Sequence, residues 1–378
     1  MTKALAAERV RRDIEVLARA GLDVDTFVAE SMDSLNRAVS FDAVCLGTLD
    51  PSTGLLTGTF KLGSLRGVDA HDHEWGLMEY GTSEPTAFLQ MAAAGVSAAG
   101  VHAGTVGADR SARLEEFMRP HFGFADELRA LCRDERGNVW AGIALFREGT
   151  RTFFDSDEVS YLGSLAGSLA LGMRAGLLTT LADYGPALQG PIVLIIDPSD
   201  EVSRMSLGAD ERLTGLTQGN TDSVEGLIGS LVGAARRYAN GESQVPARSR
   251  IRAIGGMWLV LHATPLRSRD GASGEVVVTI EEARPPEIVP LVVAAFGLTA
   301  RERDIISLVL QGLDTKEIAG RLYLSSYTVQ DHLKAVFDKA GVRSRRELIA
   351  RVYFDQYVPR MGAVLGPSGW FVDERAAS

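Results

Sequence analysis

Near the C-terminus, the sequence places three polar side chains that suit the reading of DNA base pairs close together. They are Gln330, Asp331 and Lys334. A glutamine amide can form two hydrogen bonds with adenine, a carboxylate can accept one from the amino group of cytosine, and a lysine can donate to guanine or to a phosphate. If one helix carries all three, its outer face has the chemistry for direct recognition of bases.

Hydroxyl groups and a basic residue near the same segment suit the phosphate backbone of a duplex. Ser325, Ser326 and Thr328 lie where the helix is expected to begin, so their hydroxyls and the free amides of the first turn can donate to phosphate oxygens. Lys316, near the start of the preceding helix, is also available to the backbone. Groups that position a duplex therefore stand beside groups that distinguish its bases.

The spacing of apolar residues predicts that this segment is a helix with one buried face. The apolar stripe consists of Val329, Leu333, Val336, Phe337 and Ala340. The residues expected to face away from it are Tyr327, Gln330, Asp331, Lys334 and Asp338. A helix about 10 Å wide fits the major groove, where side chains near its N-terminal end reach base edges.

Signals for helix starts and ends predict three more helices around this one. Capping-box spacing occurs three times, in Thr299 with Glu302, Asp314 with Glu317, and Ser344 with Glu347. Gly312 and Gly341 stand where helices are expected to end. Ala319 offers a small side chain where the second helix would cross the third. The stretch from Leu298 to Val352 is therefore predicted to be a four-helix helix-turn-helix domain.

The spacing alone leaves two interpretations of the outer face open. Amphipathic helix pairs are common, and a few polar or charged residues on one face usually form only a solvated surface. In one interpretation the outer face of the third helix binds DNA. In the other it only meets water.

The segment resembles the C-terminal domain of the LuxR and FixJ class of regulators. The resemblance spans about 55 residues and is carried by LTARERDII and GLDTKEIAGRLYLSSYTVQDHLKAVFDKAGVRSRRELIA. It implies that Gln330, Asp331 and Lys334 read bases, and that a helix from Arg346 to Phe354 contributes to dimerisation. It also implies that phosphates lie near Lys316, Thr328, Arg343 and Arg345. Family members often carry a basic residue in place of Gln330, so the resemblance does not fix the base preference.

Charge is distributed unevenly along the 378 residues. The chain has 39 lysines and arginines against 49 aspartates and glutamates, and its net charge of -10 would disfavour a nucleic-acid partner for the chain as a whole. From Leu298 to Phe354, however, ten basic residues stand against seven acidic ones, which gives +3 and leaves -13 for the rest. A mildly basic module is therefore attached to an acidic body.

The N-terminal part of the chain has the pattern of an α+β domain. Residues 8–40 space apolar side chains as two helices broken near Gly21. Two hairpins are expected, FDAVCLGTLD with GLLTGTFKLG and ADELRALCRD with NVWAGIALFRE, separated by an irregular stretch rich in glycine and alanine. One long helix, DSDEVSYLGSLAGSLALGMRAGLL, follows. These segments resemble a GAF domain.

A stretch that resembles a linker, Asp183 to Pro191, precedes a second α+β pattern. Its order is strand, strand, helix and three strands, which is the order of PAS-type sensor domains. The expected fold class is α+β and multidomain, with an all-α four-helix module at the C-terminal end. The expected parts are a GAF-like sensor domain with N-terminal helices at 1–182, a PAS-like domain at 183–285, a linker at 286–297, the helix-turn-helix domain at 298–356 and a tail at 357–378.

The sequence predicts no metal site, cofactor or catalytic set. His71-Asp72-His73-Glu74 has the composition of a metal site, but alternation in a polar loop offers at most two ligands on one side. No GxGxxG leads from a strand into a helix, no GxxxxGK[ST] is present, and no Ser/His/Asp set stands out. The chain is therefore not expected to be an enzyme.

The cysteines and two of the tryptophans are expected to have structural roles. Cys45 and Cys132 are far apart, form no CxxC pair and lie in predicted strands, where each suits a small core position. A cysteine that faces a cavity would suit redox sensing only if its thiolate were stabilised. Trp140 and Trp258 lie in predicted strands and are expected in the core.

Neither secretion nor membrane insertion is expected. The N-terminus MTKALAAERVRRDIEVLARAG has charges among its apolar positions and lacks the unbroken apolar core of a signal peptide. No apolar run reaches membrane-spanning length. A cytoplasmic location fits these features best.

Together these features predict a homodimeric transcription regulator that binds double-stranded DNA and responds to a small-molecule effector. The domain order resembles a group of actinobacterial one-component regulators, and GAF or PAS folds typically enclose a cavity between sheet and helices. No aspartate pocket of a phosphoryl receiver precedes the module, so control by phosphorylation is not expected.

Three alternatives for the N-terminal part stay open. In the first, its core is filled by its own side chains and it acts only in dimerisation. In the second, it binds a partner protein in place of a metabolite. In the third, it performs chemistry, although no catalytic set supports that interpretation.

Overall fold

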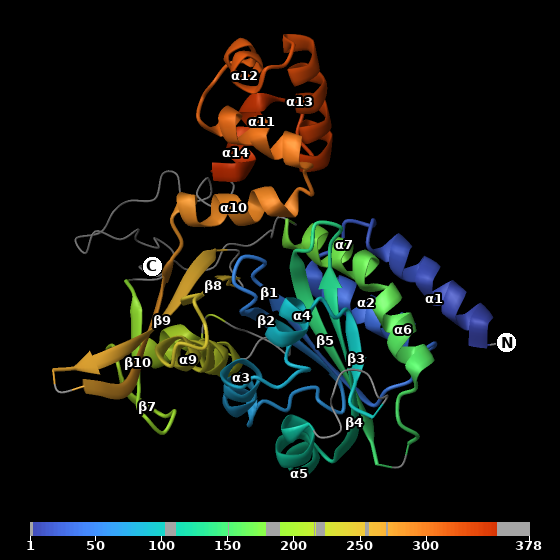
Figure 1. The fold of residues 1–378 in the computed structure, drawn as a ribbon, viewed down its shortest axis with the longest axis vertical. Helices are drawn as coiled ribbons and strands as arrows, with labels where there is room; N and C mark the ends of the chain where they lie inside the picture. Colours follow the sequence, from blue (N-terminus) through green and yellow to red (C-terminus); the bar gives the residue numbers. More distant parts are fainter. Residues whose placement is uncertain are drawn as a thin grey trace, which may run out of the picture. The chain divides into compact units, whose positions relative to one another are not determined.

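The computed structural model describes residues 3–102, 111–149, 151–178, 190–214, 216, 224–253, 257–269 and 271–353. These residues form two compact units (Figure 1). The first unit holds the described residues up to 282, and the second holds residues 283–353. The predicted linker at 183–191 and the tail at 357–378 lie almost entirely outside the described residues. No helix among those described is both long enough and apolar enough to span a bilayer.

The first sheet of the first unit is antiparallel and has the strand order β2-β1-β5-β4-β3. Its strands are β1 (Ala43–Leu49), β2 (Leu56–Gly63), β3 (Ala98–Gly100), β4 (Phe124–Arg133) and β5 (Val139–Glu148). Both predicted hairpins are confirmed, β1 with β2 and β4 with β5. Each contains a glycine with positive φ in its turn, Gly54 at +72° and Gly137 at +86°, where a side chain would be strained.

Helices cover both faces of this sheet. One face packs against α2 and α7, and the group of helices on that side consists of α1 (Lys3–Leu17), α2 (Val24–Asn36), α6 (Ser156–Ser164) and α7 (Ala166–Leu177). The other face carries α3 (Asp72–Gly81), α4 (Phe88–Ala94), the π-helical segment η1 (Arg113–Met118) and α5 (Arg119–Phe122) (Figure 1). The helix break near Gly21 is confirmed, with φ +69° at that residue.

Two expectations for this region were wrong. The stretch rich in glycine and alanine is not irregular, because it holds α3, α4, β3 and η1. Its apolar residues follow no clean helical period because these short elements bury only part of their surface. The single long helix is two helices, α6 and α7, which meet at Leu165.

The second sheet of the first unit is also antiparallel, with the strand order β7-β6-β10-β9-β8. Its strands are β6 (Ile192–Ile196), β7 (Val202–Met205), β8 (Ala247–Arg252), β9 (Trp258–Ser268) and β10 (Gly271–Glu282). The predicted helix is α9 (Val224–Ala239), and a short helix that was not predicted, α8 (Ala209–Thr214), precedes it. The predicted order of strands around the main helix is therefore confirmed.

Glycines bring the two halves of the first unit into close contact. Helices α3 and α9 lie side by side (Figure 1). A Cβ atom at Gly229 would overlap the backbone of His73, and one at Gly76 would overlap the backbone of Gly226. At the neighbouring sheet edges, the buried guanidinium of Arg250 on β8 contacts Asp50 at 2.5 and 2.7 Å. The two halves therefore pack as one body.

The described residues of the second unit form five helices. They are α10 (Pro285–Ala295), α11 (Ala300–Leu310), α12 (Thr315–Leu322), α13 (Ser326–Ala340) and α14 (Arg345–Tyr353). The last four confirm the predicted four-helix pattern. The stretch 286–297, expected to be a linker, contains helix α10, whose first turn begins with a proline and whose Ile288, Leu291 and Val292 are buried.

We predict that Gly229→Ala lowers the stability of the first unit, because the added methyl group forces α9 away from α3. The expected loss is about 1–3 kcal/mol, the usual cost of overpacking. Urea unfolding of the full chain, followed by tryptophan fluorescence, measures it. Gly167→Ala on the exposed face of α7, where an added Cβ meets nothing within 4 Å, is the control and should stabilise by up to about 1 kcal/mol. Unchanged stability of Gly229→Ala would contradict the close packing.

Candidate nucleic-acid interface and ligand cavity

Helix α13 has well-defined ends and one buried face. Its N-cap is Ser325, whose hydroxyl accepts a hydrogen bond from the Thr328 amide at 3.0 Å. Its C-cap is Gly341, which adopts the left-handed conformation with φ +66°. The predicted apolar stripe is buried at Val329, Leu333, Val336 and Ala340 and half-buried at Phe337. The predicted inner face is therefore confirmed.

The outer face of α13 consists of the polar side chains that the periodicity predicts. All five of these residues are exposed: Tyr327, Gln330, Asp331, Lys334 and Asp338. Since Gln330 and Lys334 are one helical turn apart and Asp331 lies between them, the three candidate base-reading residues share one surface. That surface is continuous with the N-terminal end of the helix.

The candidate phosphate-binding residues surround the start of α13 and the end of the module. Ser325 and Ser326 are exposed, and Thr328 is half-buried with its hydroxyl 2.8 Å from that of Ser325. Lys316, in the first turn of α12, and Arg343, in the turn before α14, are also exposed. Each of these side chains except Thr328 can reach a partner without rearrangement of the module.

Arg345 differs from the other candidate phosphate contacts, because it already has a partner within the module. Its side chain is half-buried, and its guanidinium donates a hydrogen bond to the carbonyl oxygen of Leu313. This contact ties the first turn of α14 to the loop between α11 and α12. A guanidinium has five N–H donors, so the remaining ones are still able to serve a phosphate.

An ion pair that involves the capping box of α11 holds α13 against the rest of the module. The amino group of Lys339 lies 2.7 and 2.9 Å from the carboxylate oxygens of Glu302. Glu302 also accepts a hydrogen bond from the Thr299 amide at 2.7 Å, which completes the capping box of α11. Burial alone would raise the pKa of Glu302, but hydrogen bonds from Lys339 and Thr299 outweigh it and lower that pKa. The carboxylate therefore stays charged.

The remaining predicted caps are confirmed in part. Asp314 and Glu317 form a complete capping box at the start of α12. At α14 the Glu347 amide donates to the Ser344 hydroxyl, but the Glu347 carboxylate accepts from the Arg343 amide in place of the Ser344 amide.

One exposed side chain beside the candidate interface was not predicted from the sequence. Tyr323, at the turn between α12 and α13, has φ +55° and is 96% exposed. Left-handed backbone is uncommon outside glycine, asparagine and aspartate, so no sequence signal marks a tyrosine for this position. Tyr323 lies two residues before Ser325, the N-cap of α13.

We predict that Glu302→Gln weakens the hold on α13 at neutral pH by about 1–2 kcal/mol, because the amide keeps the capping-box shape and loses the charge. The pKa of Glu302 lies below its ordinary value of 4.5, so its contribution to stability is present above that value and is lost as pH falls through the lowered pKa. Hydrogen exchange of amides in α11 and α13, near pH 6 and near pH 3.5, measures both effects.

Glu317→Gln makes the same change in the capping box of α12 and is the control. We expect it to leave protection of the α13 amides unchanged. If wild type and Glu302→Gln showed the same loss of protection between the two pH values, the ion pair would not contribute.

The first unit contains a cavity between the first sheet and helices α3 and α4. The cavity is small, with a volume of about 50 Å³, and it is partly open to solvent. Its wall is formed by Cys45, Gly47, Leu56, Thr59, Lys61, Asp72, Trp75, Gly76, Glu79, Tyr80, Phe88, Arg129, Ala144 and Gly226. Three aromatic rings and two pairs of opposite charges therefore face one small space, as in many ligand sites.

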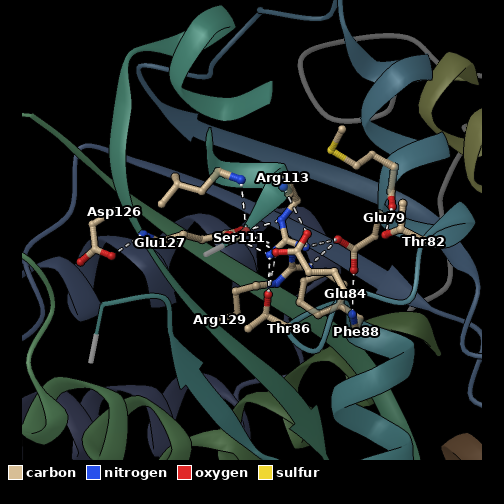
Figure 2. Close-up of polar contacts among 12 residues, drawn as sticks. Glu79, Thr82, Glu84, Thr86, Phe88, Ser111, Arg113, Asp126, Glu127 and Arg129 are labelled. Carbon is tan, nitrogen blue, oxygen red and sulfur yellow. Dashed lines mark hydrogen bonds and ion pairs between the residues drawn. The ribbon is translucent and has the colours of Figure 1, made fainter. Parts of the chain in front are cut away.

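A buried network of charges supports one wall of the cavity. Figure 2 shows Arg113 and Arg129 among the carboxylates of Glu79, Glu84 and Glu127. Arg113 lies 2.8 Å from Glu127, and Arg129 lies 2.8 Å from Glu79. The guanidinium of Arg129 also stacks on the ring of the cavity residue Phe88, 3.9 Å from its centroid. The wall is therefore held rigidly by paired charges.

The opposite wall holds a second buried ion pair. The amino group of Lys61 lies 2.6 Å from both carboxylate oxygens of Asp72. Burial would lower the pKa of Lys61, but hydrogen bonds to Asp69 and Asp72 outweigh it and raise that pKa. Two buried polar atoms on cavity-lining residues, the hydroxyl of Tyr80 and Nε of Arg129, have no hydrogen-bond partner within the described part of the chain.

The cysteines are inert in this setting. Burial raises the pKa of Cys45, which lines the cavity, and that of Cys132 to about 12. Neither thiolate is stabilised at neutral pH, so redox sensing through a lowered pKa is not supported. Trp140 and Trp258 are buried in their strands, as the sequence predicted.

Comparison with known proteins relates the C-terminal module to a family of bacterial regulators. The family model for bacterial regulatory proteins of the luxR family matches residues 297–352. Over 55 residues the chain is 38% identical to the spore germination protein GerE of Bacillus subtilis, a match that covers 15% of this chain and 74% of GerE. Over 53 residues it is 50% identical to a putative HTH-type transcriptional regulator of Mycobacterium tuberculosis strain H37Rv, which covers 14% of this chain and 6% of that protein.

Similar solved structures include two that extend over more of the chain. One is free methionine-R-sulfoxide reductase from Neisseria meningitidis, with TM-score 0.29, 17% identity, and coverage of 47% of this chain and 93% of that one. Another is the phage VqmA-DPO complex, with TM-score 0.23, 18% identity, and coverage of 43% and 79%. Both scores are low, so neither likeness bears on fold or function.

The match to GerE covers most of that protein, and the matched residues are those that form α11 to α14. The chain spans only a small part of the length of the mycobacterial relatives. The family assignment therefore rests on the C-terminal module and its match to GerE. This chain belongs to the luxR family of bacterial regulatory proteins.

Proposed function

We propose that this chain is a cytoplasmic transcription regulator that binds double-stranded DNA through α13. Gln330, Asp331 and Lys334 then lie in the major groove and contact base edges. The observation that carries this proposal is that all three are exposed on one face of a helix whose opposite face is buried in its own module. A helix held in this way can enter a groove without unfolding.

Contacts to phosphates would position the module. The exposed residues near the ends of the helices are Lys316, Ser325, Ser326 and Arg343. The free amides of the first turn of α13 point outward from its N-terminal end, where they can donate to a phosphate. Thr328 and the spare donors of Arg345 are further candidates. The net positive charge of the segment from Leu298 to Phe354 attracts phosphates, whereas the acidic rest of the chain repels them.

We further propose that the chain binds a two-fold operator as a homodimer, in part through α14. Two copies of α13 must then lie about 34 Å apart, one turn of the duplex. Any change in the first unit that alters this spacing would alter affinity for the operator.

We predict different losses for two lysines. Lys334→Ala weakens binding to an operator selected from random duplexes by about 1–3 kcal/mol, because a base contact is lost. Lys316→Ala weakens binding to all sequences and lowers the salt slope by about 1, because a phosphate contact is lost. Fluorescence anisotropy over a range of salt concentrations, with selected and random duplexes, measures both. Equal losses on both duplexes for both variants would contradict the assignment.

For the first unit, we propose a GAF-like domain at 1–182 and a PAS-like domain at 183–285, which together sense a small molecule in the cavity beside α3. The aromatic rings of Trp75, Tyr80 and Phe88 suit a small ligand with an apolar part, and the unpaired polar atoms of Tyr80 and Arg129 suit a polar group on it. The small space and its aromatic and charged lining support this proposal over a core filled entirely by its own side chains.

The contact between α3 and α9 supports a route for the response. Helix α3 supplies Asp72, Trp75, Glu79 and Tyr80 to the cavity and packs on α9 backbone to backbone. A ligand that moved α3 would therefore move α9. Such a ligand must bind two arrangements unequally, since equal affinity shifts no equilibrium. A partner protein that binds the first unit is the competing proposal.

We predict that Ala144→Leu fills the cavity and abolishes ligand binding. A defined library of metabolites is screened by thermal shift against wild type, and one or more compounds should raise Tm by about 2–4 °C. The same compounds should change operator affinity in wild type and leave Ala144→Leu unaffected.

Ala93→Leu makes the same change on the exposed end of α4 and should respond as wild type does. Two results would favour a partner protein instead: no compound binds wild type, or compounds bind both variants equally.

A further inference from the structure

Two histidines and a glutamate from separate segments lie close together among the helices that cover one face of the first sheet. His71 precedes α3, Glu74 lies in its first turn, and His121 lies in α5. One carboxylate oxygen of Glu74 is 3.8 Å from Nδ1 of His71 and 4.0 Å from Nε2 of His121. We propose that these three side chains bind a divalent transition-metal ion, with Zn²⁺ as the best fit.

The donor atoms suit such an ion. Two imidazole nitrogens with one carboxylate oxygen form a donor set that Zn²⁺ uses when one coordination position stays open to water or to another ligand. Mg²⁺ and Ca²⁺ prefer sites built from oxygen alone. This mixed set therefore selects against the two commonest hard cations.

The distances are compatible with tetrahedral binding. The three ligand atoms lie within 4.8 Å of one another. Metal bonds of about 2.0–2.2 Å place ligand atoms about 3.4 Å apart in a tetrahedron. The ligand atoms must therefore come closer together when the ion binds.

The surroundings resemble a half-open metal site. The centroids of the two imidazole rings lie 4.0 Å apart. Two protonated imidazoles at this distance would repel each other, whereas two neutral ones can share one bound cation. Phe117 lies 5.1 Å from the ring of His121, and Phe122 lies 5.8 Å from that of His71, so an apolar wall backs the cluster. The histidine side chains are 34% and 32% exposed, which lets an ion enter from water.

The other members of the His-Asp-His-Glu run have partners elsewhere. Asp72 pairs with Lys61, and Nε2 of His73 lies 2.7 Å from the carbonyl oxygen of Asp200. The run thus supplies two ligands, His71 and Glu74, which are three residues apart and are not the alternating pair considered from the sequence, and α5 adds the third. A bound ion would join the start of α3, which lines the cavity, to α5.

The test uses tag-free full-length protein, stripped by a chelator and titrated with Zn²⁺ in isothermal calorimetry. Wild type should bind one ion per chain in the micromolar range or tighter. Substituting groups that only orient metal ligands typically costs tenfold or more, so His71→Ala and His121→Ala should each weaken binding by at least about tenfold. Glu74→Gln, on a side chain 56% exposed, should do the same without loss of folding.

His73→Gln is the matched control, because it keeps a hydrogen-bond donor toward Asp200 and should bind as wild type does. The proposal is overturned if wild type binds no stoichiometric Zn²⁺. It is also overturned if the three ligand variants bind as tightly as His73→Gln, since the ion would then be adventitious. Neither result depends on DNA binding, so this test stands apart from the proposed regulator function.

Discussion

The burial of one face of α13 is the constraint on which the proposed function depends. With Val329 and Val336 fixed in the module, the helix cannot rotate, so the same residues always face outward. The ion pair between Glu302 and Lys339 and the cap at Ser325 hold the two ends of this arrangement. A helix that is already fixed in its module loses less conformational entropy when it binds a duplex than a mobile helix would.

In the first unit, close packing fixes the position of helix α3. Here glycines, which have no side chain to separate two helices, bring α3 and α9 together backbone to backbone. Buried charges hold the wall of the cavity, and the same helix α3 borders the cavity and carries His71 and Glu74 at its start. A cavity ligand and a bound ion would therefore act on one helix, and both effects would reach α9 through the same contact.

The sequence predicted elements with a strong local signal and missed those set by tertiary contacts. Periodicity and capping boxes were sufficient for α11 to α13, the hairpins and the outer face with Lys334. They were insufficient for α3 and α4, whose residues face a cavity and a neighbouring helix and so lack a clean period. Left-handed Tyr323, the partner of Arg345 and the approach of His121 to His71 depend on chain segments that only the fold brings together.

The most direct test of the central claim is a crystal structure of the full chain bound to a duplex selected from random sequences. The account predicts that α13 lies in the major groove, with Gln330, Asp331 and Lys334 within hydrogen-bond distance of base edges. A complex in which this face of α13 contacts no base, or in which another surface of the chain holds the duplex, would contradict it.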